Sequence, residues 1–272
     1  MDASRSIQLL TADGVRLHAS WWKATDTAVE NALVVFVPGF TGHGRVPAVR
    51  RLVTRLRRRT DLLVLELRGH GRSSGASTLG AREATDVDAA LRWGRAQGYQ
   101  RIATVGFSFG AGVVICHAGL HGGVDAVAAV SAPSRWYVRD TPKMRALHVM
   151  VESSGGRLFA RLWFKVRLAG GWRTVPPSPL EVVHRIAPTP LLIVHGDADH
   201  YFPIEHPLAL AAAAGEGCQV WLEPGFSHAE NQLSPALADR LAAWLARPLA
   251  AGGQPADRGR PDRSRTEVGR RD

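Results

Sequence analysis

The chain has 272 residues, of which 45% are hydrophobic, and its formal net charge is +10. This length and apolar content suit one sizeable globular domain and exclude a fibrous or wholly disordered chain. Residues 1–6 lack the apolar stretch of a secretory signal, and no run approaches the roughly 20 apolar residues that span a bilayer. We therefore expect a cytoplasmic protein with no integral membrane segment.

The first predicted elements are two antiparallel strands, at residues 7–11 and 15–22, joined by the turn signal Ala12-Asp13-Gly14. After them the pattern changes to alternating strand and helix. The later strands are continuous apolar runs, which are typical of parallel strands buried on both faces. These strands are expected at residues 33–37, 62–66, 102–105, 124–131, 191–195 and 219–222, and the helices at 46–59, 84–97, 110–120, 204–214 and 235–246.

This order of elements predicts an α/β fold with a mostly parallel central sheet of about eight strands. Helices on both faces complete a three-layer α/β/α sandwich. We expect a single domain over residues 1–247, in which an insertion at about residues 134–188 interrupts the alternation of strands and helices. Residues 248–272 are rich in Arg, Pro and Gly, and we predict a disordered tail there.

One motif points to chemistry. The strand at residues 102–105 runs into Gly106-Phe107-Ser108-Phe109-Gly110, and a stretch of small residues suited to a helix follows. A strand, a sharp turn and a helix around G-x-S-x-G form a nucleophile elbow. Glycine is needed on both sides of Ser108 because the backbone there is strained and a side chain would collide with its neighbours. Ser108 is therefore the predicted nucleophile.

A serine hydroxyl is a poor nucleophile at neutral pH, so it needs a base to take its proton and an acid to orient that base. Gly225-Phe226-Ser227-His228 follows the last predicted strand, which makes His228 the candidate base. Asp197 and Asp199 both lie in the loop after the strand at residues 191–195, and either can supply the carboxylate. The order along the chain is Ser, Asp, His.

With these motifs in this order, the chain resembles the α/β-hydrolase superfamily from about residue 15 to residue 245. The segment Glu66-Leu67-Arg68-Gly69-His70-Gly71-Arg72-Ser73-Ser74-Gly75 is similar to the loop that follows the second parallel strand in that family. The resemblance implies a structural role for His70. It also implies the α/β-hydrolase fold, and a small helical cap over the active site, formed by the insertion at about residues 134–188.

The resemblance also bears on the choice of acid. Similar hydrolases have the spacing His-Gly-x-x-Asp-x-x-x-Pro, with the triad acid at the fifth position, and residues 195–203 match this spacing with Asp199. Asp199 is therefore the preferred acid. Asp197 is then expected to accept local backbone hydrogen bonds in a turn.

Acyl transfer also requires two backbone N–H groups directed at the developing negative charge. We expect one from Phe109, the residue after the nucleophile. The other is expected from Phe40, in the turn Pro38-Gly39-Phe40-Thr41-Gly42 after the first parallel strand. Many relatives have His-Gly where this chain has Pro38-Gly39, so the donor in this loop can shift by one residue.

Together these residues predict a serine hydrolase that cleaves an ester or related acyl bond of a small, apolar acyl substrate through an acyl-enzyme. No cofactor and no metal site are expected. The alternative is an acyltransferase or an acyl-CoA thioesterase with the same triad, because the fold hosts all of these activities. A non-catalytic binding protein is disfavoured because all three triad positions hold competent residues. The oligomeric state stays open.

Positive charge is concentrated in the predicted cap, where residues 134–175 hold nine basic residues against two acidic ones. Arg157, Arg161 and Lys165 recur every fourth residue with apolar residues between them, which predicts a basic amphipathic helix. We favour a solvated basic face with an apolar underside packed over the pocket. There are two other interpretations. The basic residues can form a site for the anionic head of a substrate, or they can make peripheral contact with an anionic membrane. Helix 46–59 carries an arginine cluster without interleaved aromatic residues, so nucleic-acid binding is not expected.

Overall fold

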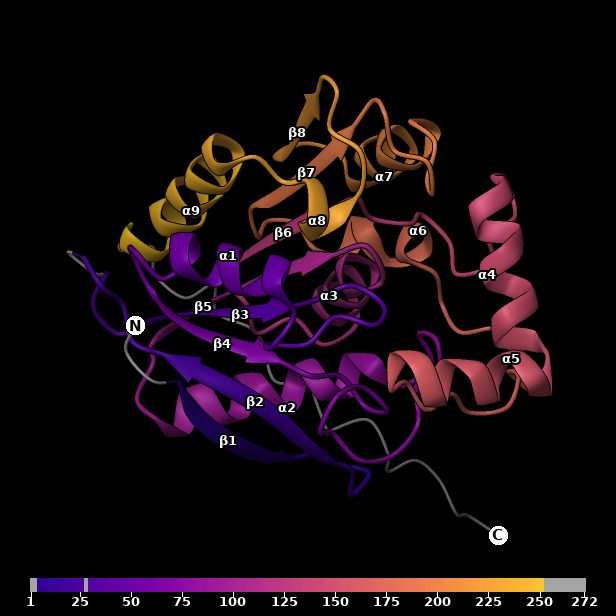
Figure 1. Ribbon diagram of the computed structural model, residues 1–272. Helices are drawn as coiled ribbons and strands as arrows, with labels where there is room; N and C mark the ends of the chain where they lie inside the picture. The colour runs from indigo at the N-terminus through magenta and orange to yellow at the C-terminus, as the bar shows by residue number, and fades with distance from the viewer. Residues whose placement is uncertain (1–3, 27–28, 252–272) are drawn as a thin grey trace, which may run out of the picture.

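The computed structural model describes residues 4–26 and 29–251, and its centre is a sheet of eight strands (Figure 1). The strands are β1 (Arg5–Leu10), β2 (Arg16–Trp22), β3 (Ala32–Val37), β4 (Asp61–Leu65), β5 (Arg101–Phe107), β6 (Ala126–Val130), β7 (Leu191–Gly196) and β8 (Cys218–Glu223). Their order across the sheet is β1-β2-β4-β3-β5-β6-β7-β8. β1 and β2 pair antiparallel, β2 is also antiparallel to β4, and the strands from β3 to β8 are parallel to one another.

Helices cover both faces of the sheet. One face carries α1 (Pro47–Leu56) and α9 (Pro235–Ala250), and the other carries α2 (Glu83–Ala96), α3 (Phe109–Leu120) and α7 (Glu205–Ala214). In α1 the buried residues Val49, Leu52, Val53 and Leu56 recur at intervals of three and four, so a single apolar stripe faces the sheet. The predicted three-layer α/β/α sandwich is therefore confirmed.

The strand at the far edge differs from its prediction. All parallel strands were expected to be buried on both faces, and this is wrong for β8, where Gln219 and Leu222 are exposed. The reason is topological, because β8 pairs with β7 alone and lies at the edge of the sheet. The central strand β3, with a partner on each side, is buried at all six positions.

The last helix is longer than predicted. It was expected to end at residue 246, with a tail from residue 248, whereas α9 continues through Pro248 to Ala250. Leu249 is fully buried against the sheet, and its carbonyl accepts a hydrogen bond of 2.5 Å from the Arg101 guanidinium. Pro248 favours the end of a helix, but the packing of Leu249 keeps the last turn of α9 helical. The rest of the predicted tail, residues 252–272, lies outside the described residues.

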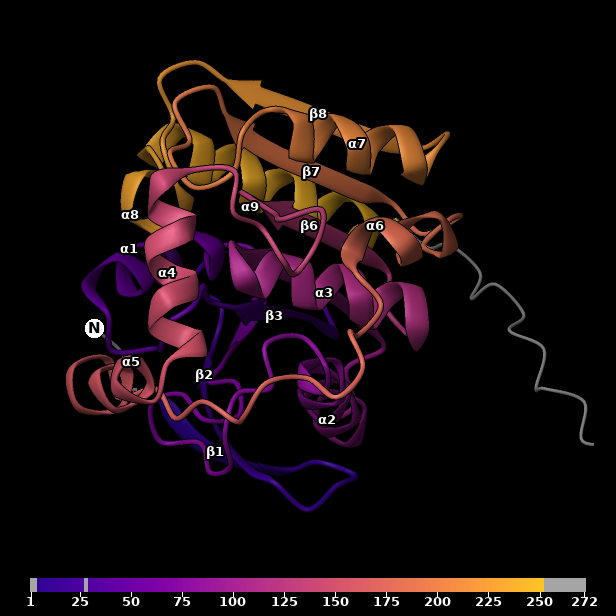
Figure 2. The same ribbon diagram turned by 90° about the vertical axis from the view of Figure 1, so that its right-hand side faces the viewer.

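Residues 134–188 contain five helical elements, the first three near the carboxyl ends of the parallel strands and the last two packed against α3 (Figure 1). They are α4 (Pro142–Glu152), α5 (Ser154–Phe159), the π-helical turn η1 (Ala160–Phe164), α6 (Pro179–Val182) and the 3₁₀ turn η2 (Val183–Arg185). Figures 1 and 2 show α4 and α5 set steeply to each other and apart from the sheet. Met144 of α4 joins Val138 and Phe202 in a small apolar cluster, which ties this helix to the loop after β7.

The predicted basic amphipathic helix is only partly correct. α5 ends at Phe159, the wider π-helical turn follows, and Lys165 has a left-handed backbone with φ of 55°. A π-helical turn pairs residues five apart, so it breaks the fourfold spacing from which a continuous stripe was inferred. The expected apolar underside is wrong for most of the segment, because Leu158, Leu162 and Trp163 point into solvent.

Candidate active site

Ser108 stands at the tip of a tight turn between β5 and α3. Its backbone has φ of 52° and ψ of −120°, a conformation that strains any residue other than glycine. A Cβ atom at Gly106 would lie 2.3 Å from the Gly110 carbonyl oxygen, and one at Gly110 would lie 2.3 Å from the carbonyl oxygen of Val37. The structure therefore requires glycine on both sides of Ser108, as the sequence predicted.

The side chains of Ser108, His228 and Asp199 form one hydrogen-bonded row. His228 Nε2 lies 2.9 Å from Ser108 Oγ, and His228 Nδ1 lies 2.7 Å from Asp199 Oδ2. The imidazole is 15% exposed and the carboxylate only 1%. With Nδ1–H donating to the carboxylate, Nε2 is left to accept the serine proton.

Asp199 is held from several directions. Its Oδ1 accepts the backbone N–H groups of Tyr201, at 2.8 Å, and Phe202, at 3.1 Å. Burial acts to raise the pKa of this carboxyl, but the hydrogen bonds from His228 and the two N–H groups outweigh it and hold the pKa below its ordinary value. Asp199 therefore stays ionised and keeps the imidazole in one tautomer and orientation.

Asp197, the other candidate acid, points elsewhere. Its Oδ1 accepts the backbone N–H of Gly225 at 2.7 Å, across the turn that precedes the histidine. This contact is the turn-stabilising role expected for it. Of the two aspartates, the structure brings only Asp199 to His228.

The loop that carries His228 is positioned by two features that the sequence analysis missed. Ser131, buried at the end of β6, accepts the N–H of Ala229 at 3.1 Å through its hydroxyl. Gly196 lets the loop after β8 approach closely, since a Cβ atom there would lie 1.8 Å from the Phe226 carbonyl oxygen. The sequence offered one signal for these roles, which is that Ser131 and Gly196 lie at the carboxyl ends of predicted strands.

The two expected oxyanion donors flank the nucleophile. The turn after β3 lies beside Ser108, because a Cβ atom at Gly39 would be 3.3 Å from Ser108 Cβ. Phe109 begins α3, so its N–H lies at the positive end of that helix. Within residues 4–26 and 29–251, nothing accepts a hydrogen bond from the N–H of Phe40 or of Phe109, and both are available to a substrate oxygen. The ring of His70 stacks on Phe109 and meets Phe40 edge-on.

Glu230 supports the oxyanion turn from behind. Its Oε1 accepts the N–H of Gly39 at 3.2 Å, while its buried Oε2 has no hydrogen-bond partner in the described part of the chain. Burial raises the pKa of this carboxyl, which favours the neutral form. The sequence analysis did not assign Glu230 to this position. Glu230 also borders a cavity of about 300 Å³, whose other walls include Ala48, Arg51, Leu52, Thr54, Arg55 and Leu233.

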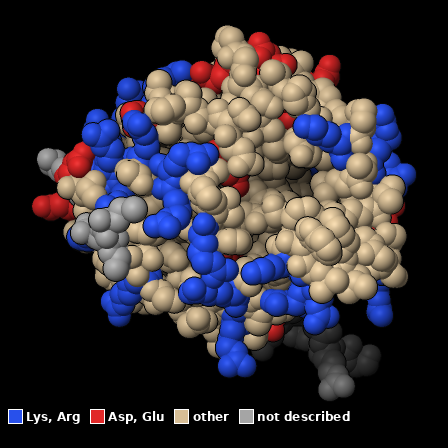
Figure 3. Space-filling view, viewed as in Figure 1, with Lys and Arg blue, Asp and Glu red and all other residues tan. Residues whose placement is uncertain are grey.

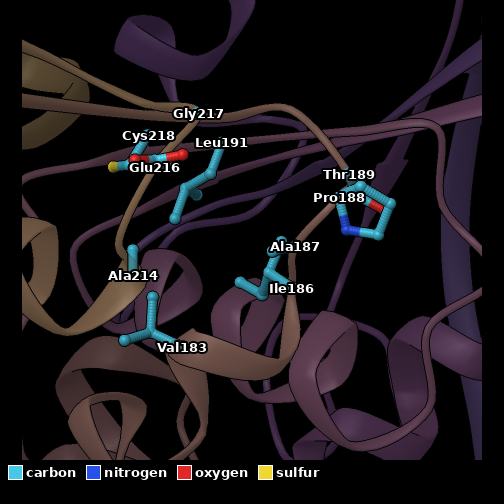
Figure 4. Close-up of a pocket in the computed structure, with 10 residues that line it drawn as sticks. All are labelled: Val183, Ile186, Ala187, Pro188, Thr189, Leu191, Ala214, Glu216, Gly217 and Cys218. Atoms are coloured by element: carbon cyan, nitrogen blue, oxygen red, sulfur yellow. The ribbon is translucent and has the colours of Figure 1, made fainter.

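A second cavity is remote from this site. Figure 4 shows it at the amino ends of β7 and β8, near Leu191 and Cys218, whereas Ser108 lies at the carboxyl edge of the sheet. Its volume is about 20 Å³, room for about one water molecule, so it is not a substrate pocket. In the part of the chain that the structure describes, no three His, Cys, Asp or Glu side chains gather as a metal site requires. No helix among the described residues has the length and apolarity needed to cross a membrane.

Comparison with known proteins bears on the fold. A family model described as the alpha/beta hydrolase fold matches residues 32–153, from β3 through the nucleophile turn into the cap. No curated protein matches the chain.

Similar solved structures include the esterase Pf2001 of Pyrococcus furiosus, with 19% identity over 90% of this chain and 92% of that one, at a TM-score of 0.68. The alpha/beta hydrolase GrgF of Penicillium sp. sh18 has 18% identity over 92% of this chain and 100% of that one, at 0.70. An esterase domain from a Rhodothermus marinus protein has 21% identity over 90% and 98%, at 0.62. The likeness covers about nine tenths of this chain and nearly the whole length of each of the others, and it shows that the chain has the alpha/beta-hydrolase fold.

Proposed function

We propose that the protein is a serine hydrolase that cleaves an ester or related acyl bond through an acyl-enzyme. The observation that carries this proposal is the position of His228 Nε2, 2.9 Å from Ser108 Oγ, while Nδ1 is 2.7 Å from Asp199. A base within hydrogen-bond reach of a hydroxyl, itself oriented by a buried carboxylate, is the arrangement that activates serine. The esterases among the similar structures agree with this activity.

In the proposed first step, Ser108 Oγ attacks the acyl carbonyl carbon as its proton passes to His228 Nε2. Asp199 stabilises the imidazolium that forms, since its carboxylate remains ionised. The carbonyl oxygen becomes an oxyanion and is held by the N–H groups of Phe40 and Phe109. The imidazolium then donates its proton to the leaving group, and the acyl-enzyme remains on Ser108.

In the second step, water replaces the leaving group. His228 takes a proton from this water, which attacks the acyl carbonyl through a second oxyanion in the same N–H site. Collapse of that intermediate returns a proton to Ser108 Oγ and releases the acid. No other group has to gain or lose a proton over the whole cycle.

Aromatic side chains around the serine favour an apolar acyl group. The rings of Phe40 and Phe109 lie 6.1 Å apart, and Trp136 from the cap segment lies 5.7 Å from Phe109. On the other side, the ring of Tyr201 lies 4.4 Å from that of His228. We infer a small, apolar acyl group bounded by these rings.

The nucleophile is tested by a fluorophosphonate probe, which reacts with activated serines without requiring the natural substrate. Intact-mass spectrometry is expected to show one adduct on the wild type and none on Ser108→Ala. Hydrolysis of p-nitrophenyl esters of increasing chain length is expected to disappear in the same variant. Absence of an adduct on well-folded wild type would overturn the proposal.

The acid is tested by a matched pair of variants in one loop. Asp199→Asn is expected to lower kcat/KM for the best ester by about 10³- to 10⁴-fold, because the histidine loses its orienting charge. Asp197→Asn is expected to stay within about threefold of wild type, since this side chain accepts a hydrogen bond in a turn. Equal losses in the two variants would contradict the assignment of Asp199.

A further inference from the structure

The cap carries a face of exposed apolar residues. Leu158, Leu162 and Trp163 are 56%, 63% and 71% exposed, and Phe159 and Phe164 are 43% and 40% exposed. We call these five residues the cap face. The ring of Phe159 stacks on Trp163 with 5.2 Å between centroids and meets Phe164 edge-on at 5.6 Å. Single exposed apolar residues are ordinary, but five within seven positions form a contiguous patch of the kind that binds a partner.

Charge around the cap face has one sign. Arg157, Arg161 and Lys165 alternate with its residues, and residues 153–180 contain no aspartate or glutamate. Arg161 and Lys165 form no salt bridge with any residue that the structure describes. Glu152, the acid just before this stretch, is occupied in salt bridges within the cap. Figure 3 shows the uncharged surface over α5 and η1 with basic atoms beside it.

The cap face is held outward by the residues on its other side. Ala160 and Val166 are buried, and the N–H of Val166 donates to the Ala160 carbonyl at 3.1 Å. Next along the chain, the N–H of Arg167 donates to Gly69 at 2.8 Å, which attaches the segment to the loop after β4. The apolar side chains therefore cannot turn inward unless these contacts break.

We propose that the cap face docks the protein onto an anionic lipid bilayer. Leucine, tryptophan and phenylalanine side chains enter the boundary between headgroups and acyl chains, and basic side chains beside them lie at the level of lipid phosphates. A second copy of the chain fits the surface less well. A symmetric contact would place the same basic residues of both copies against each other, with no acid in the segment to neutralise them.

The test is co-sedimentation of the full-length protein with vesicles. Wild type is expected to sediment with vesicles that contain phosphatidylglycerol and to remain in solution with phosphatidylcholine alone. Raising the salt concentration is expected to weaken binding, because screening reduces the attraction between the basic residues and the lipid phosphates. Ser108→Ala is expected to bind as wild type does, which separates this proposal from the proposed function.

Two double variants address the two parts of the surface. Leu162→Ser with Trp163→Ser, and Arg161→Glu with Lys165→Glu, are each expected to weaken vesicle binding about tenfold or more. Leu10→Ser, at an equally exposed leucine of β1, and Arg185→Glu, at an exposed arginine of η2, are the matched controls and are expected to bind normally. Circular dichroism and the melting temperature establish that each variant is folded.

Several results would overturn the proposal. One is folded wild type that fails to sediment with anionic vesicles. Another is binding that survives both double variants, or that the two control substitutions weaken to the same extent. A dimer in sedimentation velocity that only the cap-face variants dissociate, in a protein without vesicle binding, would assign the surface to a second copy.

Discussion

At the scale of single residues, Glu230 shows how a buried carboxyl can serve a site without reacting. It accepts the N–H of Gly39, and its other oxygen is buried without a partner among the described residues. Gly39 precedes Phe40, whose N–H we assign to the oxyanion. In the proposed reaction, an ionised carboxylate here would oppose the negative charge on the substrate oxygen, so the raised pKa of Glu230, caused by burial, suits that proposal.

This raised pKa predicts a pH-dependent effect on stability. Below the ordinary glutamate pKa, Glu230 holds its proton in both the folded and the unfolded state. Wild type and Glu230→Gln are therefore expected to have similar free energies of unfolding at such a pH. As the pH rises, the unfolded state loses the proton first and wild type loses stability until the folded-state pKa is passed. Glu230→Gln is therefore expected to raise the free energy of unfolding more at pH 8 than at pH 5.

Urea denaturation at the two pH values measures this difference. Glu216→Gln, at an exposed glutamate, is the matched control and is expected to change stability little at either pH. An advantage of Glu230→Gln that is the same at pH 5 and pH 8 would contradict a buried carboxyl that holds its proton.

The residues of the proposed triad were easier to predict than the residues that position them. Ser108 and His228 are marked by motifs, and Asp199 by a spacing, because each depends on its neighbours along the chain. Ser131 and Glu230 act through contacts with Ala229 and with Gly39, and no local pattern marks them. The contact with Gly39 joins residues 191 positions apart, so only the fold brings the two together.

At the scale of elements, the sheet was predictable because its strands have a simple physical signature. Six apolar runs separated by helical stretches specify parallel strands, and loops at their carboxyl ends carry the site. The serine turn follows β5, Asp199 follows β7 and His228 follows β8. Chain order therefore placed the three residues at one edge, although it could not give the distances between them.

The cap was less predictable because its structure depends on a local change of helix type. Arg157, Arg161 and Lys165 have the spacing of an α-helix, but η1 replaces that helix after Phe159. The apolar residues between the basic ones were expected to face the pocket, but their spacing alone does not distinguish the pocket side from the solvent side. Only burial in the structure distinguishes Ala160 and Val166, which attach the segment, from the cap face.

At the scale of the whole molecule, one buried arginine joins three parts of the fold. The guanidinium of Arg68, in the loop after β4, donates to Asp86 of α2 at 2.7 and 2.9 Å and to Asp13 of the β1–β2 turn at 2.8 Å. Arg68 and Asp86 are almost completely buried, while Asp13 is partly exposed. This network attaches the antiparallel hairpin and a helix to the loop that also carries His70.

We expect Arg68→Met to lower the free energy of unfolding by about 3–5 kcal/mol, because it leaves the Asp86 carboxylate buried without its counter-ion. Arg82→Met removes an exposed arginine 3.5 Å from Asp13, and is expected to cost at most about 1 kcal/mol. Adding Asp86→Asn to Arg68→Met should recover part of the loss, since no buried charge is then unpaired. Urea denaturation at pH 7 measures all three. A loss in Arg68→Met as small as that in Arg82→Met would mean that packing alone, and not the buried charge network, attaches the hairpin to the sheet.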